Sequence, residues 1–153
     1  HKFQYGNMNI PGIYIDENLM RMCRTHRMMF AQLAEQLLRE NQREKALEVL
    51  DYAEQQLPGY NIPYDYTSAT MAGLYFILKE DEKAVAIMDN VANTCAEYIR
   101  FAHSLNKRQQ EVMESTTGRQ AAILSYVLQT CERHGHRELV EKYYADYAAY
   151  AGM

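Results

Sequence analysis

Residues 30–58 limit the folds open to this chain more than any other stretch. Their apolar side chains recur at intervals of three and four, which is the spacing of one face of an α-helix. The two runs are Phe30, Leu33, Ala34, Leu37 and Leu38, and then Ala46, Leu47, Val49, Leu50 and Ala53. Between the runs Asn41 and Glu44 match a capping box, and at the far end Pro58 cannot continue a helix. The stretch therefore predicts two antiparallel helices joined by a tight turn at Asn41–Gln42.

Eight positions in this stretch also match a repeat pattern. A tetratricopeptide repeat spans about 34 residues and places large, small and proline residues at fixed positions along a helical hairpin. The matching residues are Phe30, Leu33, Ala34, Leu37, Ala46, Leu50, Ala53 and Pro58. Phe30 stands in place of a tryptophan, and Leu37 in place of an aromatic residue. The predicted hairpin therefore resembles a tetratricopeptide repeat.

Two further repeats can be written along the chain. Ala84 takes the place of Ala46 in a second copy of the pattern, so that a first repeat lies at about 27–60 and a second at about 65–103. The segment 117–151 resembles a third, degenerate repeat, because its last helix echoes the sequence of the second helix.

Single residues predict where several helices begin and end. Asp16 is expected to cap the first helix, because a side-chain oxygen there can accept a backbone N–H of the first turn. Thr117 with Gln120 matches a capping box and predicts the start of the fifth helix, which Gly135 should end. The fourth helix is expected to run on past His103, either straight or after a kink, because no Gly or Pro occurs between His103 and Gly118.

These patterns together predict an all-α fold of about six helices with a long first helix. Residues 1–15 are rich in Gly and Asn and are expected to form an extended arm packed on that helix. Residues 16–153 are expected to form a single tetratricopeptide-like domain, whose antiparallel hairpins stack right-handedly.

Composition and charge limit the classes of function that are open to this chain. The chain has 20 acidic and 16 basic side chains and a net charge of −4, which argues against a nucleic-acid-binding surface. No run of about 18 apolar residues is present, so this segment is not expected to enter a membrane. The sequence contains three cysteines, Cys23, Cys95 and Cys131, which is an odd number and excludes a complete disulfide framework. A single disulfide between two of them stays an open alternative.

Patterns typical of catalysis and metal binding are weak. Cys131, His134 and His136 lie close together and are zinc-ligand types, but no second pair of ligands accompanies them. The sequence contains no phosphate-binding glycine loop and none of the short hydrolase or zinc-protease motifs. The segment is therefore predicted not to be an enzyme, with no catalytic residue, metal or cofactor.

A binding groove is predicted on the first helix of each repeat, because these helices line the concave surface of the family that the chain resembles. The groove residues are Met28, Glu35, Leu38, Arg39, Tyr66, Phe76 and Ile77, with Leu124 further along. Grooves rich in Met and aromatic side chains hold extended peptides or helices. Two occupants stay open: a protein or peptide partner, or a neighbouring segment of this chain such as residues 1–15.

A short basic stripe is predicted on the first helix. Arg21, Arg24 and Arg27 follow one another at intervals of three. Two interpretations stay open: a solvated face that pairs with nearby carboxylates, or a contact for an anion or an acidic partner.

A second resemblance is strongest over residues 6–63, with GNMNIPGIYIDEN at the start of this stretch and VLDYAEQQLPGYNIPYDY at its end, and fades after about Asn106. This stretch resembles the C-terminal soluble tail of bacterial multi-pass membrane proteins similar to protein O-mannosyltransferase-type glycosyltransferases. The resemblance implies a non-catalytic, periplasmic interaction or positioning module, tethered to the inner membrane by a region upstream of His1. Its partner would be a protein, a peptide or the membrane portion of its own parent chain. The alternative is a stand-alone peptide-binding scaffold in the cytoplasm.

Overall fold

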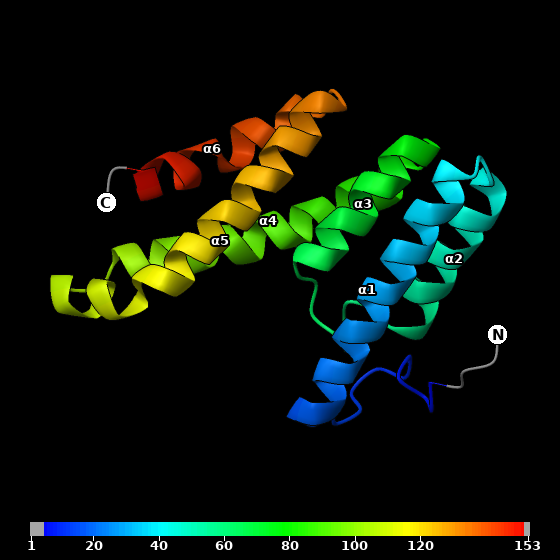
Figure 1. The fold of residues 1–153 in the computed structure, drawn as a ribbon. Helices are drawn as coiled ribbons and strands as arrows, with labels where there is room; N and C mark the ends of the chain where they lie inside the picture. Colours follow the sequence, from blue (N-terminus) through cyan, green and yellow to red (C-terminus); the bar gives the residue numbers. More distant parts are fainter. Residues whose placement is uncertain (1–4, 152–153) are drawn as a thin grey trace. The chain divides into compact units, whose positions relative to one another are not determined.

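The computed structural model describes residues 5–151, and within this range the chain forms six helices and no strand. The helices are α1 (Glu17–Arg39), α2 (Arg43–Gln56), α3 (Tyr66–Leu78), α4 (Asp81–His103), α5 (Lys107–Arg133) and α6 (Arg137–Ala151). Figure 1 shows them in chain order, from blue to red. The prediction of an all-α fold with about six helices is confirmed for this part of the chain.

Polar side chains fix the starts of two helices. The Asp16 carboxylate accepts the backbone N–H of Leu19 at 2.9 Å, as predicted, and α1 then runs for 23 residues. At the start of α3, Asp65 and Ser68 each accept the other's backbone N–H in a capping box. The first helix therefore begins where the sequence predicts it.

Three helices end in the same left-handed turn. Asn41, Lys79 and Gly135 have φ of +58°, +71° and +85°, and the next helix begins two residues after each of them. The residue that follows each one donates its N–H to a carbonyl in the last turn: Gln42 to Leu37, Glu80 to Tyr75, and His136 to Cys131. This is the Schellman motif, which pairs the carbonyls left open at a helix end.

The predicted capping box of Asn41 and Glu44 is wrong. Asn41 instead occupies the left-handed position that ends α1, where an Asn is tolerated better than most other residues. Gln42 is the residue before α2, and its side chain makes no capping hydrogen bond.

The predicted start of the fifth helix is also wrong. α4 ends at His103, and α5 begins at Lys107 behind a capping box of Asn106 and Gln109. Thr117 lies buried inside α5, and its hydroxyl donates to the Met113 carbonyl one turn earlier. The segment expected as a third repeat, 117–151, thus begins in the middle of a 27-residue helix.

The chain divides into two compact units, one ending at Asp81 and one beginning at Glu82, and each is described by itself. In the first unit, α1 packs against α2 and α3, and α2 also packs against α3. Small side chains are buried where the helices meet: Ala31 and Ala34 on α1, and Ala46 and Ala53 on α2. The lack of bulk at these positions lets the helix backbones approach closely.

In the second unit, α5 packs against α6, and polar contacts join α6 to α4. The Asp89 carboxylate accepts Lys142 Nζ at 2.7 Å and the Tyr143 hydroxyl at 2.8 Å. Partial burial would raise the pKa of Asp89, but these two hydrogen bonds outweigh it and hold the pKa below its ordinary value. Arg100 Nε also lies 3.3 Å from the Asp146 carboxylate.

The arm is only partly extended. Gly6, Asn7 and Gly12 have positive φ and the chain turns there, whereas residues 13–16 are without turns. The Asn61 side-chain amide donates to the carbonyls of Met8 and Ile10, both at 2.7 Å. Tyr5, Met8 and Ile15 pack with buried Cys23, Leu57 and Ile62. The arm is thus held against α1 and the α2–α3 loop; its predicted residues 1–4 lie outside the described range.

Candidate functional site

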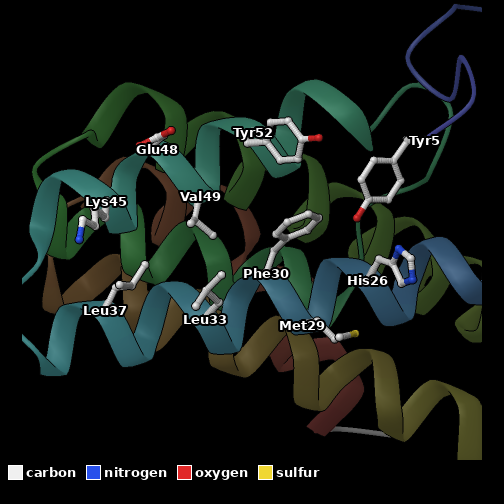
Figure 2. Close-up of a pocket in the computed structure, with 10 residues that line it drawn as sticks. All are labelled: Tyr5, His26, Met29, Phe30, Leu33, Leu37, Lys45, Glu48, Val49 and Tyr52. Carbon is white, nitrogen blue, oxygen red and sulfur yellow. The ribbon is translucent and has the colours of Figure 1, made fainter. Parts of the chain in front are cut away.

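An open apolar groove lies between α1 and α2 and has a volume of about 650 Å³. α1 contributes Met29, Phe30, Leu33 and Leu37 to its walls, and α2 contributes Val49 and Tyr52. Figure 2 shows Leu33 and Phe30 of α1 pointing toward α2 and Val49 of α2 pointing toward α1, with Met29 at the outer edge of α1. The groove lies entirely within the first unit.

The groove exists because α1 has two apolar faces. One face buries Cys23, Arg27, Ala31 and Ala34, whereas Leu33 remains 48% exposed on the groove side. The sequence pattern placed Leu33 and Ala34 on one buried face, and only Ala34 is fully buried. On α2 the fully buried residues are likewise others than those of the groove. The hairpin of α1 and α2 therefore exposes apolar side chains in addition to those that it buries in its core.

Aromatic rings close one end of the groove. The Tyr5 ring of the arm lies 5.5 Å from the His26 ring, 6.1 Å from Phe30 and 6.4 Å from Tyr52, measured between ring centroids. Partial burial raises the pKa of the Tyr5 hydroxyl. Figure 2 places Leu37 and Lys45 at the opposite end, away from the arm. The arm thus fills the aromatic end and leaves the aliphatic end open.

The seven residues of the predicted groove lie elsewhere. Met28, Glu35, Arg39, Tyr66 and Ile77 are exposed, Leu38 is half-buried and Phe76 is fully buried. None of them is among the residues that line the α1–α2 groove. Glu35 and Arg39 pair with each other at 2.7 Å, one helical turn apart. Phe76 cannot contact a ligand while the fold is intact.

The predicted basic stripe is broken by Arg27. Its side chain is only 1% exposed, and its guanidinium donates to the carbonyls of Leu57 at 2.9 Å, Ile62 at 2.7 Å and Pro63 at 3.1 Å. Burial lowers the pKa of Arg27, while the carboxylates of Asp65 and Glu54 oppose that change. Arg21 and Arg24 remain on the surface. Arg27 therefore fixes the α2–α3 loop and is not a surface contact for an anion.

Neighbouring side chains complete this loop attachment. The Tyr64 hydroxyl donates to the Glu54 carboxylate at 2.6 Å, and its ring lies 5.5 Å from the Arg27 guanidinium carbon. Burial and the bond to Glu54 raise the pKa of Tyr64, and burial likewise raises that of Glu54. Gly59 leaves room for the ring, because a Cβ there would lie 2.5 Å from it. Arg27, Glu54 and Tyr64 thus connect α1, α2 and the α2–α3 loop in the interior of the first unit.

The described residues offer little for catalysis or for a metal. Burial raises the pKa of Cys95 and of Cys131 to about 11, so both thiols stay protonated and weakly nucleophilic at neutral pH. Within residues 5–151, no three His, Cys, Asp or Glu side chains gather closely enough to hold a metal ion. His134 and His136 lie in the turn after α5, close in sequence to buried Cys131.

Two findings bear on the class of protein. In the part of the chain that the structure describes, no helix has both the length and the apolar character needed to cross a membrane. Comparison of the chain with protein-family models, with curated proteins and with solved structures gives no match.

Proposed function

We propose that this chain is a non-catalytic interaction module that binds an apolar segment of a protein partner in the α1–α2 groove. The open groove is the observation that carries the proposal. Leu33 and Met29 line it and are 48% and 55% exposed. Removing such surface from water is worth about 25 cal/mol per Å², so a complementary partner would gain free energy by covering it.

The wider setting belongs to the same proposal. The module would be tetratricopeptide-like, with right-handed stacking, and would form the periplasmic tail of a glycosyltransferase-like membrane protein. Its partner would be a separate protein or peptide, or the membrane portion of its own parent chain. The repeat character is supported by the turns at Asn41 and Lys79, whose separation equals that of Ala46 and Ala84 in the repeat pattern, and the membrane setting by the sequence resemblance over residues 6–63. A stand-alone cytoplasmic scaffold is the alternative, and a reading frame without apolar spans upstream of His1 would favour it.

Two substitutions on α1 form a matched pair for the test. Leu33 is 48% exposed and lies in the groove, whereas Met28 is 44% exposed and lies outside it. Aspartate at either position should be tolerated by the fold to a similar degree, because both side chains already reach water. A difference in binding between Leu33→Asp and Met28→Asp therefore reports the groove and not the stability of the helix.

The experiment is selection from a displayed library of random peptides, followed by fluorescence polarisation with the selected peptides. We expect sequences with spaced aliphatic or aromatic residues, bound at least about tenfold more weakly by Leu33→Asp than by the unchanged chain. Met28→Asp should bind as the unchanged chain does. Failure to select any sequence, or equal binding by the two variants, would overturn the proposal.

A further inference from the structure

In the first unit, α1 and α3 occupy equivalent positions along the chain. This equivalence bears on the kind of partner that the α1–α2 groove binds. Asn41 and Lys79 form the same turn at the ends of α1 and α3, and the same shift along the chain relates Ala34 to Ala72, which are both fully buried. The helices that follow these turns, at Arg43 and Asp81, begin with that shift between them as well. α3 therefore corresponds to the C-terminal part of α1, in the same register relative to the turn that follows.

The same shift relates the groove residues of α1 to buried residues of α3. Leu33 and Leu37 of the groove correspond to Met71 and Tyr75 of α3, and both of these are fully buried. α3 packs against α2, and the Tyr75 hydroxyl donates to the Asp51 carboxylate of α2 at 2.9 Å. The positions that α1 leaves open are thus buried in α3, and at Tyr75, the equivalent of Leu37, α3 contacts α2.

We infer that the groove takes an amphipathic α-helix with a face like that of α2, and not an extended peptide. The buried face of α2 consists of Ala46, Leu50 and Ala53, which is a small–Leu–small pattern at intervals of four and three. Small residues opposite Leu33 and Leu37 let a second helix backbone approach, as α2 approaches its neighbours. This inference rests on the proposed function, since it names the partner class of the same groove.

The probe is a stapled peptide with the sequence of residues 43–56, added to the full chain with labelled methyl groups. A hydrocarbon staple replaces the side chains at positions 44 and 48, on the side opposite to Ala46, Leu50 and Ala53. We expect saturable shifts of the Leu33, Leu37 and Val49 methyls in the NMR spectrum. Binding should weaken at least about tenfold in Leu33→Asp and stay unchanged in Met28→Asp.

Two control peptides separate helix recognition from general stickiness. A stapled peptide with Ala46→Glu and Ala53→Glu keeps the helix and loses the small face, and an unstapled peptide with Leu50→Pro cannot be helical. Neither should shift the groove methyls.

Equal binding by the proline peptide would overturn the helix inference and leave the proposed function standing. The inference would also fail if no α2-like peptide bound while library peptides did. If neither kind of peptide bound, the proposed function would fail as well.

Discussion

At the scale of single residues, Arg27 provides the clearest case of a charge that serves the fold. Its three acceptors are backbone carbonyls of the loop between α2 and α3, and a buried carbonyl without a partner destabilises the folded state by about 1–3 kcal/mol. The planar guanidinium reaches all three, whereas a lysine ammonium lacks the fork that does so.

Arg27→Lys should therefore lower the free energy of unfolding by about 1–3 kcal/mol, because at least one buried carbonyl loses its donor. Urea denaturation followed by circular dichroism measures the change. Arg24→Lys is the control, since Arg24 is exposed and its substitution should change stability by about 0.5 kcal/mol or less. Similar values for the two variants would contradict the role given to Arg27.

Gly59→Ala should lower the free energy of unfolding by about 1–3 kcal/mol, because the new methyl would meet the Tyr64 ring. The ring cannot move aside easily, since its hydroxyl is bonded to Glu54. The same denaturation experiment in a Tyr64→Ala background provides the control. If Gly59→Ala were as harmful there, the cause would lie in the backbone and not in the ring.

The spacing of Arg27 could be interpreted in two ways from the sequence alone. It lies three residues after Arg24, as in a stripe, but also four after Cys23 and four before Ala31, as in a buried face. The carbonyls that decide the matter lie 30 to 36 residues away in the chain. Local pattern cannot reveal a partner at that distance.

At the scale of helices and turns, the same left-handed turn joins three pairs of successive helices. A residue other than Gly at positive φ costs about 1 kcal/mol or more, yet Lys79 occupies this position where Gly135 occupies the equivalent one. The turns at Lys79 and Gly135 have the same backbone hydrogen bonds. Exchanging Lys and Gly between these two positions should therefore change the free energy of unfolding by the cost of the positive φ alone.

Lys79→Gly should raise the free energy of unfolding by about 1 kcal/mol, and Gly135→Lys should lower it by about as much. Thermal and urea denaturation of the two variants measure both changes. Lys83→Gly is the control, because Lys83 lies within α4 and a glycine there should lower stability by about 1 kcal/mol. A loss of stability in Lys79→Gly would rule out strain at this turn.

Helix existence could be predicted from the sequence, whereas some boundaries and the site could not. Asp16 and Gly135 mark helix ends by side-chain chemistry that acts locally. Asn106 with Gln109 and Thr117 with Gln120 offer the same local pattern, and only packing decides that the first pair begins α5. The groove was missed for a related reason: helical spacing identifies apolar positions but not which of two apolar faces is covered.

At the scale of the whole molecule, the two units should respond to acid in opposite directions. Glu54 of the first unit has a pKa raised above 4.5 by burial, with the Tyr64 bond and Arg27 opposing this. The folded state therefore binds a proton more readily than the unfolded state does, and protonation stabilises the fold. Asp89 of the second unit has a pKa held below 3.8, so the folded state favours the charged form there.

Lowering the pH from neutral towards about 4.5 should thus strengthen hydrogen-exchange protection of the α2 amides around Glu54, and leave the α6 amides unchanged. Below about 3.8, protection of α6 should fall, because Asp89 takes up a proton and loses its charged bond to Lys142. Exchange rates corrected for the intrinsic effect of pH give both changes. Glu54→Gln should abolish the first change alone and Asp89→Asn the second alone, since each removes one titrating carboxyl. Parallel loss of protection in both units over the whole range would instead mean that surface carboxylates, and not these two, govern the response to acid.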